Sequence, residues 1–183
     1  MSAESKNVSG QAYSLTVMAP ISPGRSSELA AHLDDLGSGD DSPLAKVPST
    51  HFARWVVLDA LIYEGGRQRH DSWSGPRLLF TSNFDGPLDA YLEGLRTGLG
   101  AAGDAIWEHC TDYPGHRDAG AFNRWMRARQ LTSSLFFAAY GDQTVQQVLD
   151  NLRVRQWLTE LALKGQALDD AELQDRFLRE YPR

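Results

Sequence analysis

His51 and Arg54 lie in the most apolar run of the chain, which covers residues 50–63. The His51 side chain can move a proton near neutral pH or bind haem iron, and Arg54 can hold a propionate or an oxyanion. A regular strand places the two on opposite faces, whereas a β-bulge brings them closer. The structural alternative has His51 bonded to the backbone at the strand entrance, and Arg54 paired with Asp59 or Asp85.

Asn83 and Asp85 flank Phe84 at the end of a second apolar run. Asn83 could orient the carbonyl of a ligand there. In the alternative, Asn83 is a turn amide and Asp85 caps the following helix, because its carboxylate can accept first-turn N–H groups. Pro87 suits that first turn, since it lacks the N–H that would be left unpaired.

A third group of functional side chains is concentrated in residues 107–113, namely Trp107, His109, Cys110 and Tyr113. The paired CxxC or HxxxH spacing of a zinc site is absent from the sequence. His109 is a candidate haem ligand, and Cys110 is expected to be a small buried hydrophobic residue. His116 lies in a polar stretch and is expected to be exposed.

Catalytic residues cannot be assigned from motifs, because the sequence has no GxGxxG, P-loop, GxSxG or HExxH pattern. The candidates are therefore ligand-binding residues chosen by residue type and position. They are His51, Arg54, Trp55, Asn83, His109 and Phe136.

Two predicted strands must position most of these candidates. Residues 50–63 are rich in β-branched and aromatic side chains and apolar on both faces, which predicts a strand covered on both sides. Residues 77–84 have one apolar and one semi-polar face. The apolar set, predicted as core beneath helices, is Leu78, Phe80 and Phe84. The semi-polar set, expected to face a cavity or a partner, is Arg77, Leu79, Thr81 and Asn83.

The remaining patterns give the order strand, helix, strand, strand, helix, strand. Alternation predicts the first strand at residues 13–21, and residues 134–140 are predicted as the last strand. This order is typical of the ferredoxin-like split βαβ fold of the α+β class, a four-stranded antiparallel sheet with helices on one face. We expect a disordered tail at residues 1–11, the α+β domain at 12–163 and a helical C-terminal extension at 164–183.

The uncovered face of such a sheet is too apolar here to remain in water. The residues expected on it are Thr16, Met18, Leu79, Thr81, Phe136 and Ala138. A second copy of the chain would cover this face, giving a homodimeric α+β barrel.

Composition limits the class of protein. The chain has 183 residues, 42% of them hydrophobic and 23% charged, and a net charge of −6, which argues against nucleic acid as a partner. We expect no transmembrane segment, since no apolar run approaches the roughly 20 residues of a membrane-spanning helix. A single cysteine and a polar N-terminus without a signal-peptide core predict a cytoplasmic location.

Several segments resemble a bacterial protein family that carries no assigned activity. The resemblance lies in the HFARW and LLFTSNFDG motifs, AIWEHCTDYPG, and the run from FNRWMRARQ to QQVL, and it covers roughly residues 13–155. Members of that family resemble dimeric α+β-barrel proteins, and longer members carry a similar module twice. The resemblance implies such a barrel here. The wider superfamily includes haem peroxidases, cofactor-free monooxygenases and cyclases, an analogy of fold alone.

Three functions follow as hypotheses. The first is a protein that binds a small apolar ligand, or a cofactor-independent oxygenase or cyclase, with its cavity between sheet and helices or inside the barrel. The second is a haem protein that uses His51 or His109 as axial ligand. The third is a non-enzymatic assembly module that binds another protein through its exposed sheet face and C-terminal helices.

Overall fold

The computed structural model describes residues 6–59 and 75–181 of the chain. These divide into two compact units, Met1–Asp142 and Gln143–Arg183. The expected domain ended at residue 163, whereas here the long helix α4 (Val145–Lys164) groups with the C-terminal unit. The last residues of the strand expected at 50–63, namely 60–63, and most of the loop that follows lie outside the described residues.

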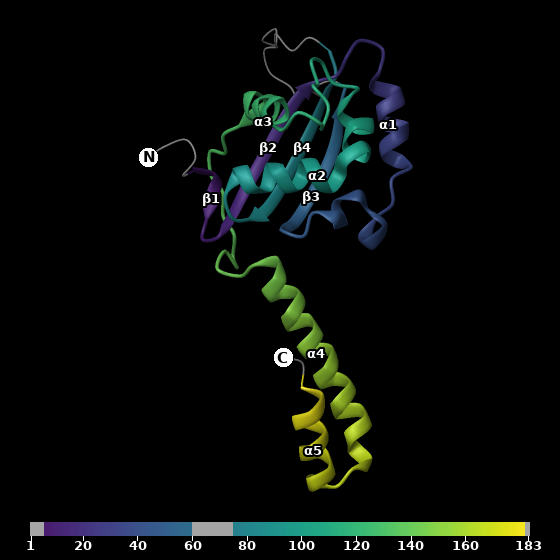
Figure 1. Ribbon diagram of the computed structural model, residues 1–183, viewed down its shortest axis with the longest axis vertical. Helices are drawn as coiled ribbons and strands as arrows, with labels where there is room; N and C mark the ends of the chain where they lie inside the picture. Colours follow the sequence, from purple (N-terminus) through teal and green to yellow (C-terminus); the bar gives the residue numbers. More distant parts are fainter. Residues whose placement is uncertain (1–5, 60–74, 182–183) are drawn as a thin grey trace, which may run out of the picture. The chain divides into compact units, whose positions relative to one another are not determined.

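The first unit is an α+β unit built on a five-stranded antiparallel sheet, which confirms the predicted class. Its strands are β1 (Val8–Ser9), β2 (Ala12–Pro20), β3 (Thr50–Leu58), β4 (Arg77–Asp85) and β5 (Gln130–Leu131). They follow the order β1-β2-β4-β3, and β5 pairs with β2 (Figure 1). Because β4 pairs with β2 along its whole length, β1 and β5 share the opposite edge of β2.

The sequence had suggested that residues 6–11 belong to a disordered tail, but they do not. Val8 and Ser9 pair with the start of β2, opposite Tyr13 and Ala12. The turn after β1 is held by a residue far away in the sequence, because the backbone N–H of Gln11 donates to the carbonyl of Gly141 at 2.5 Å. These backbone hydrogen bonds order the segment although its side chains are mostly polar.

The prediction that residues 134–140 form the last strand is also wrong. The two-residue strand β5 takes its place, with Leu131 opposite Thr16 and Gln130 opposite Val17. The reason is competition for an edge: β1 and β5 already use the free hydrogen-bonding groups of β2. The segment that follows β5 is irregular and leaves Leu135 86%, Phe137 77% and Tyr140 78% exposed.

Within the described part of the first unit, helices cover one face of this sheet and leave the other open. They are α1 (Ser26–Asp34), α2 (Leu88–Trp107) and α3 (Ala119–Ala128), which share one hydrophobic core with the inward-facing strand residues (Figure 1). Leu78, Phe80 and Phe84 are buried in that core, as predicted. The other side, here called the open face, consists of Ser14, Thr16, Met18 and Pro20 of β2, Phe52, Arg54, Val56 and Leu58 of β3, and Arg77, Leu79, Thr81, Asn83 and Asp85 of β4.

Aromatic rings fill the layer between the sheet and its helices. Phe84 of β4 stacks on Tyr91 of α2 with ring centroids 3.6 Å apart. Trp107 at the end of α2 contacts Phe80 and Phe122 edge to face, at 5.8 and 5.7 Å. Such contacts add to the large hydrophobic stabilisation of buried rings. The space in which the sequence analysis allowed a cavity is thus occupied by side chains at these positions.

Helix α2 is interrupted at Gly100. Gly100 has φ 49° and ψ −124°, a conformation that glycine adopts without steric cost. The interruption separates the half of α2 that carries Tyr91 from the half that ends at Trp107, and both of these rings contact β4.

The second unit contains α4 and α5 (Asp170–Glu180), joined by the 3₁₀ turn η4 (Gly165–Ala167). Both helices begin with a capping box, Thr144 with Gln147 and Asp169 with Glu172. Trp157 of α4 contacts the rings of Phe177 and Tyr181 at 5.2 and 5.3 Å. Within the described residues, no helix is both long and apolar enough to cross a membrane.

A close approach fixes α2 against the 3₁₀ helix η3 (Pro43–Lys46). A Cβ atom added at Gly98 would lie 2.8 Å from the carbonyl oxygen of Lys46 and 3.1 Å from Cγ2 of Val47. At Gly94, one turn earlier, the nearest such atom is 4.0 Å away. Alanine therefore fits at Gly94 and does not fit at Gly98.

We expect Gly98→Ala to lower the free energy of unfolding by about 1–3 kcal/mol, because the backbone of Lys46 must move. Gly94→Ala is the matched control and should raise it by up to about 1 kcal/mol, since alanine favours the helix. Urea denaturation followed by circular dichroism measures both. Equal stability of the two variants would contradict the close approach.

Candidate functional site

A β-bulge at His51 decides where the first candidate lies. Thr50 pairs with Phe84 and Phe52 pairs with Asn83, so His51 is an extra residue in the ladder between β3 and β4. Such bulges redirect side chains at sheet ends. Nε2 of His51 donates to Oδ1 of Asp85 at 2.6 Å, and both residues are half-buried.

The bulge also separates Thr50 from His51. Thr50 faces the helices, where its hydroxyl lies 3.2 Å from Oη of Tyr91, and Ser82 reaches the same oxygen at 2.5 Å. Burial raises the pKa of Tyr91, although the bonds from Ser82 and Thr50 act against that shift. This buried network holds the end of the β3–β4 hairpin against α2. His51 is not part of it and bonds to Asp85 on the open face.

The expected role of Asp85 as a helix cap is therefore wrong. Helix α2 has Pro87 as its N-cap residue and no side-chain hydrogen bond there. Because α2 begins at Leu88, Asp85 lies two residues before the N-cap position, and its carboxylate is hydrogen-bonded to His51 instead.

Arg54 and Asn83 lie on the same face as this pair. Arg54 stands opposite Thr81 in the ladder, and its Nε donates to Oγ1 of Thr81 at 3.1 Å. Asn83 stands opposite Phe52, whose side chain is 77% exposed. Residues opposite each other in a ladder point to the same side of the sheet. Three sequence-predicted candidates, His51, Arg54 and Asn83, thus come together on the open face.

The other candidates lie elsewhere. Trp55 faces the helices, 5.4 Å from the ring of Phe80. Phe136 is half-buried in the irregular segment after β5. His109 is only 4% exposed, and neither ring nitrogen has a hydrogen-bond partner among the described residues. Its nearest carboxylate is Glu28, with Oε2 3.6 Å from Nε2.

Cys110 is the small buried residue that the sequence indicated. It is 3% exposed, and its backbone pairs with Ile21 in an isolated bridge. Burial raises the pKa of its thiol to about 12, despite the positive charges of Arg129 and Arg25 nearby. The thiolate that would act as nucleophile or metal ligand is therefore scarce at neutral pH.

The His51–Asp85 pair has the geometry of a proton-accepting dyad. A carboxylate accepts only, so it holds the ring proton of neutral His51 on Nε2, and the lone pair lies on Nδ1. Nδ1 has no hydrogen bond among the described residues. Among those residues, no group of three or more His, Cys, Asp or Glu side chains could hold a metal ion.

Sequence reasoning missed a second carboxylate–histidine contact, because its partners lie twelve residues apart in unlike elements. Oδ1 of Asp104 accepts from Oη of Tyr113 at 2.7 Å and from the backbone N–H of His116 at 2.8 Å. Oδ2 accepts from Nδ1 of His116 at 2.5 Å. His116 is therefore half-buried rather than exposed. Burial raises the pKa of Asp104, but the bonds from Tyr113 and His116 outweigh this effect and hold that pKa below its ordinary value.

The depressed pKa of Asp104 predicts how its contribution to the free energy of unfolding changes with pH. The contribution of Asp104 is complete above its unfolded-state pKa of about 4 and is lost as the pH falls through its lower folded-state value. We expect Asp104→Asn to lower the free energy of unfolding at pH 7 by about 1–3 kcal/mol, and the gap to the wild type to narrow in acid.

Urea denaturation at neutral and acidic pH measures this difference. Asp35→Asn, a change at an exposed position after α1, is the control and should alter stability little at either pH. A constant gap for Asp104→Asn across the pH range would contradict the assignment.

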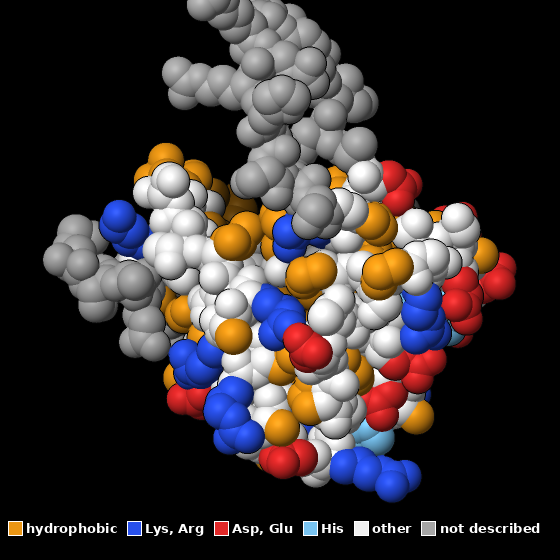
Figure 2. All heavy atoms as spheres, turned by 90° about the horizontal axis from the view of Figure 1, so that it is seen from above, with side chains coloured by type: hydrophobic (Ala, Val, Ile, Leu, Met, Phe, Trp, Pro, Cys, Tyr) orange, Lys and Arg blue, Asp and Glu red, His pale blue; other side chains and the backbone are white. Residues whose placement is uncertain are grey.

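Charges are interspersed on the part of the surface seen in Figure 2, where acidic and basic side chains alternate with hydrophobic ones and no single basic patch forms.

Comparisons of the chain with family models, with curated proteins and with solved structures find no match.

Proposed function

We propose that this chain is a small-molecule-binding protein whose binding surface is the open face of its sheet. In the same proposal it functions as a homodimer, in which two open faces come together as a ferredoxin-like α+β barrel. The strand order supports this relation: when β5 is taken as a much shortened fourth strand, the order β5-β2-β4-β3 is that of a split βαβ fold.

The bulge at His51 is the observation that carries the proposal. It adds His51 to the face that already holds Arg54 and Asn83, where a regular strand would have turned it away. A base held by a carboxylate, a guanidinium and an amide on one surface can bind and orient a polar group of a ligand. The half-buried Val56, Leu79 and Met18 provide an apolar floor beside them.

The dimer is supported by the apolar surface on this face. Phe52 is almost fully exposed although it sits in the third strand of a sheet. A second copy that packs on Phe52, Val56 and Leu79 would remove this surface from water, at roughly 25 cal/mol per Å². It would also exclude water from His51 and Arg54, which strengthens their interactions with a bound ligand.

If the protein is an enzyme, His51 is the residue we expect to move the proton, with Asp85 stabilising the charged ring. This matches the cofactor-independent oxygenase or cyclase hypothesis. In the haem alternative, His51 would bind iron through Nδ1, because Nε2 is bonded to Asp85. His109 suits that role less well, since its ring is enclosed in the core.

A second candidate function, assembly alone, is favoured by the segment after β5. Leu135, Phe137 and Tyr140 are strongly exposed within six residues of chain. An extended segment of this kind can add to the sheet edge of another protein, with backbone bonds giving affinity and side chains giving specificity.

We expect sedimentation equilibrium at micromolar concentration to show a dimer. Phe52→Asp should weaken it by at least about ten-fold, because a charge would be buried in the interface. Leu163→Asp, at an exposed apolar position of α4 in the second unit, is the matched control and should leave the dimer unchanged. A monomeric wild type, or a dimer lost only in the control, would refute the barrel.

Native mass spectrometry of the purified protein tests the binding surface itself. We expect a retained small molecule whose occupancy falls about ten-fold in His51→Gln and Arg54→Gln. The exposed Arg124 on α3 supplies the control, Arg124→Gln. A Soret band on adding haem, lost in His51→Ala or His109→Ala, would replace the proposal by the haem alternative. A dimer without any bound molecule would leave assembly alone.

A further inference from the structure

Residues 135–138, in the irregular segment after β5, have the exposure pattern of a strand but no strand to pair with. Leu135 is 86% and Phe137 77% exposed, whereas Phe136 and Ala138 are half-buried. Side chains of a strand alternate between its two faces in the same way. No backbone–backbone hydrogen bond joins residues 135–138 to the rest of the described chain. These residues can therefore accept a strand from another chain.

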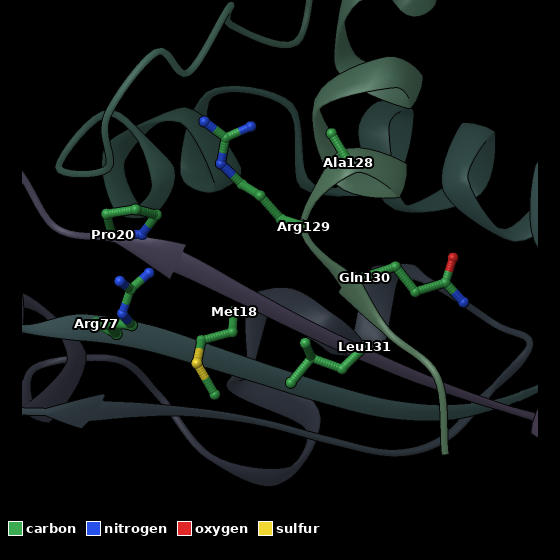
Figure 3. A pocket seen from close by; sticks show the side chains of 7 residues that line it. All are labelled: Met18, Pro20, Arg77, Ala128, Arg129, Gln130 and Leu131. Carbon is green, nitrogen blue, oxygen red and sulfur yellow. The ribbon is translucent and has the colours of Figure 1, made fainter. Parts of the chain in front are cut away.

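This part of the chain is fixed along the outer edge of β2. Figure 3 shows where it starts, with Leu131 of β5 beside Met18 of β2. Farther along, the backbone N–H of Ala138 donates to Oγ of Ser9 in β1 at 3.2 Å. In the strand order β1-β2-β4-β3, the strand β3 lies at the other edge of the sheet. Residues 135–138 therefore cannot pair with β3 of their own chain.

Strand β3 is an edge strand with no further strand beyond it in the described part of the chain. It pairs with β4 alone. None of its nine residues is buried, whereas every second residue of β4 is. Even Trp55 and Val57, which pack against the core, are only half-buried. The strand also lacks the proline and lysine residues that protect many free edges from pairing.

The two unpaired segments run in directions that suit each other. Strand β4 is antiparallel to both β2 and β3, so β3 runs in the same direction as β2. Strand β5 is antiparallel to β2, and the chain continues from it toward β1 and the start of β2. When two open faces pack about a two-fold axis along the strands, the β3 edge of each copy meets the β5 edge of the other. The segments that meet there are antiparallel.

Charge favours this arrangement over the other two-fold packing, in which β3 would meet β3. Arg54 is the middle residue of β3, so antiparallel pairing of two β3 strands about their centres would place two guanidinium groups opposite each other. Like charges opposite each other destabilise a strand pair. Residues 130–141 carry no charged side chain. Strand β3 thus meets no like charge at the β5 edge of a second copy.

We propose that residues 135–138 of each copy pair with β3 of a second copy, and that these two seams close the homodimeric barrel. The inference rests on the open-face dimer proposed above and names the strands that join its two halves. Each seam brings Leu135 and Phe137 of one copy to the strand that carries Phe52 and Arg54 in the other. Each copy therefore contributes to the surroundings of the other's binding surface.

Two single-cysteine variants test which edges meet. Arg54→Cys and Phe137→Cys carry different affinity tags and are mixed and treated with a bis-maleimide that spans about 10 Å, roughly three residues of a strand. We expect cross-links between the two variants to exceed those within either variant by at least about ten-fold, because only unlike cysteines share a seam. The native Cys110 is buried and the pKa of its thiol is raised to about 12, so the wild type supplies the background.

Sedimentation of the wild type shows whether the dimer fails together with the seam. If either variant cross-links mainly to itself, like edges meet and the seam is overturned. Absence of cross-links in variants that sediment as dimers also overturns the seam. In both cases the open-face dimer stands. A monomeric wild type overturns the dimer and the seam together.

Phe137→Pro tests the backbone pairing itself. The N–H of Ala138 faces Ser9, so in an extended chain the N–H of Phe137 faces away from β1. We expect the dissociation constant of the dimer to be at least about ten-fold higher in Phe137→Pro than in Phe137→Thr, which loses the ring but keeps the N–H. Circular dichroism checks that both variants are folded. Equal dissociation constants would overturn the pairing.

Discussion

The structure of the first unit depends on one packing constraint, the burial of one face of β2 and β4 beneath α2 and α3. Phe80 and Phe84 are locked in place by the rings of Trp107 and Tyr91. Because side chains alternate along a strand, this burial turns every second residue the other way. The open face is thus a necessary consequence of the core, and the side chains on it are those that remain available for binding.

The proposed site at His51 lies where this regular alternation is interrupted. The bulge at His51 adds a residue to the open face at one end of the β3–β4 hairpin. Functional side chains collect where backbone pairing is interrupted, because there they are not committed to the core.

The irregular segment after β5 leaves several of its large apolar side chains uncovered. It exposes Leu135, Phe137 and Tyr140 to solvent, although most large apolar side chains elsewhere in the first unit are buried. The second unit likewise buries little: Leu161 is its only buried hydrophobic side chain among the described residues. Exposed apolar surface of this kind is typical of protein-interaction sites and supports the assembly alternative, whereas the dimer proposal rests on Phe52 and the open face.

The sequence by itself determined the α+β class, the buried face of β4 and the helical character of the C-terminal extension. These features depend on residues a few positions apart, and hydrophobic periodicity records them. Only the tertiary structure decided that residues 134–140 have no strand to pair with, and that Asp85 binds His51 instead of capping a helix. Such outcomes arise because distant segments compete for the same strand edge, carboxylate or space, and no local pattern encodes which of them succeeds.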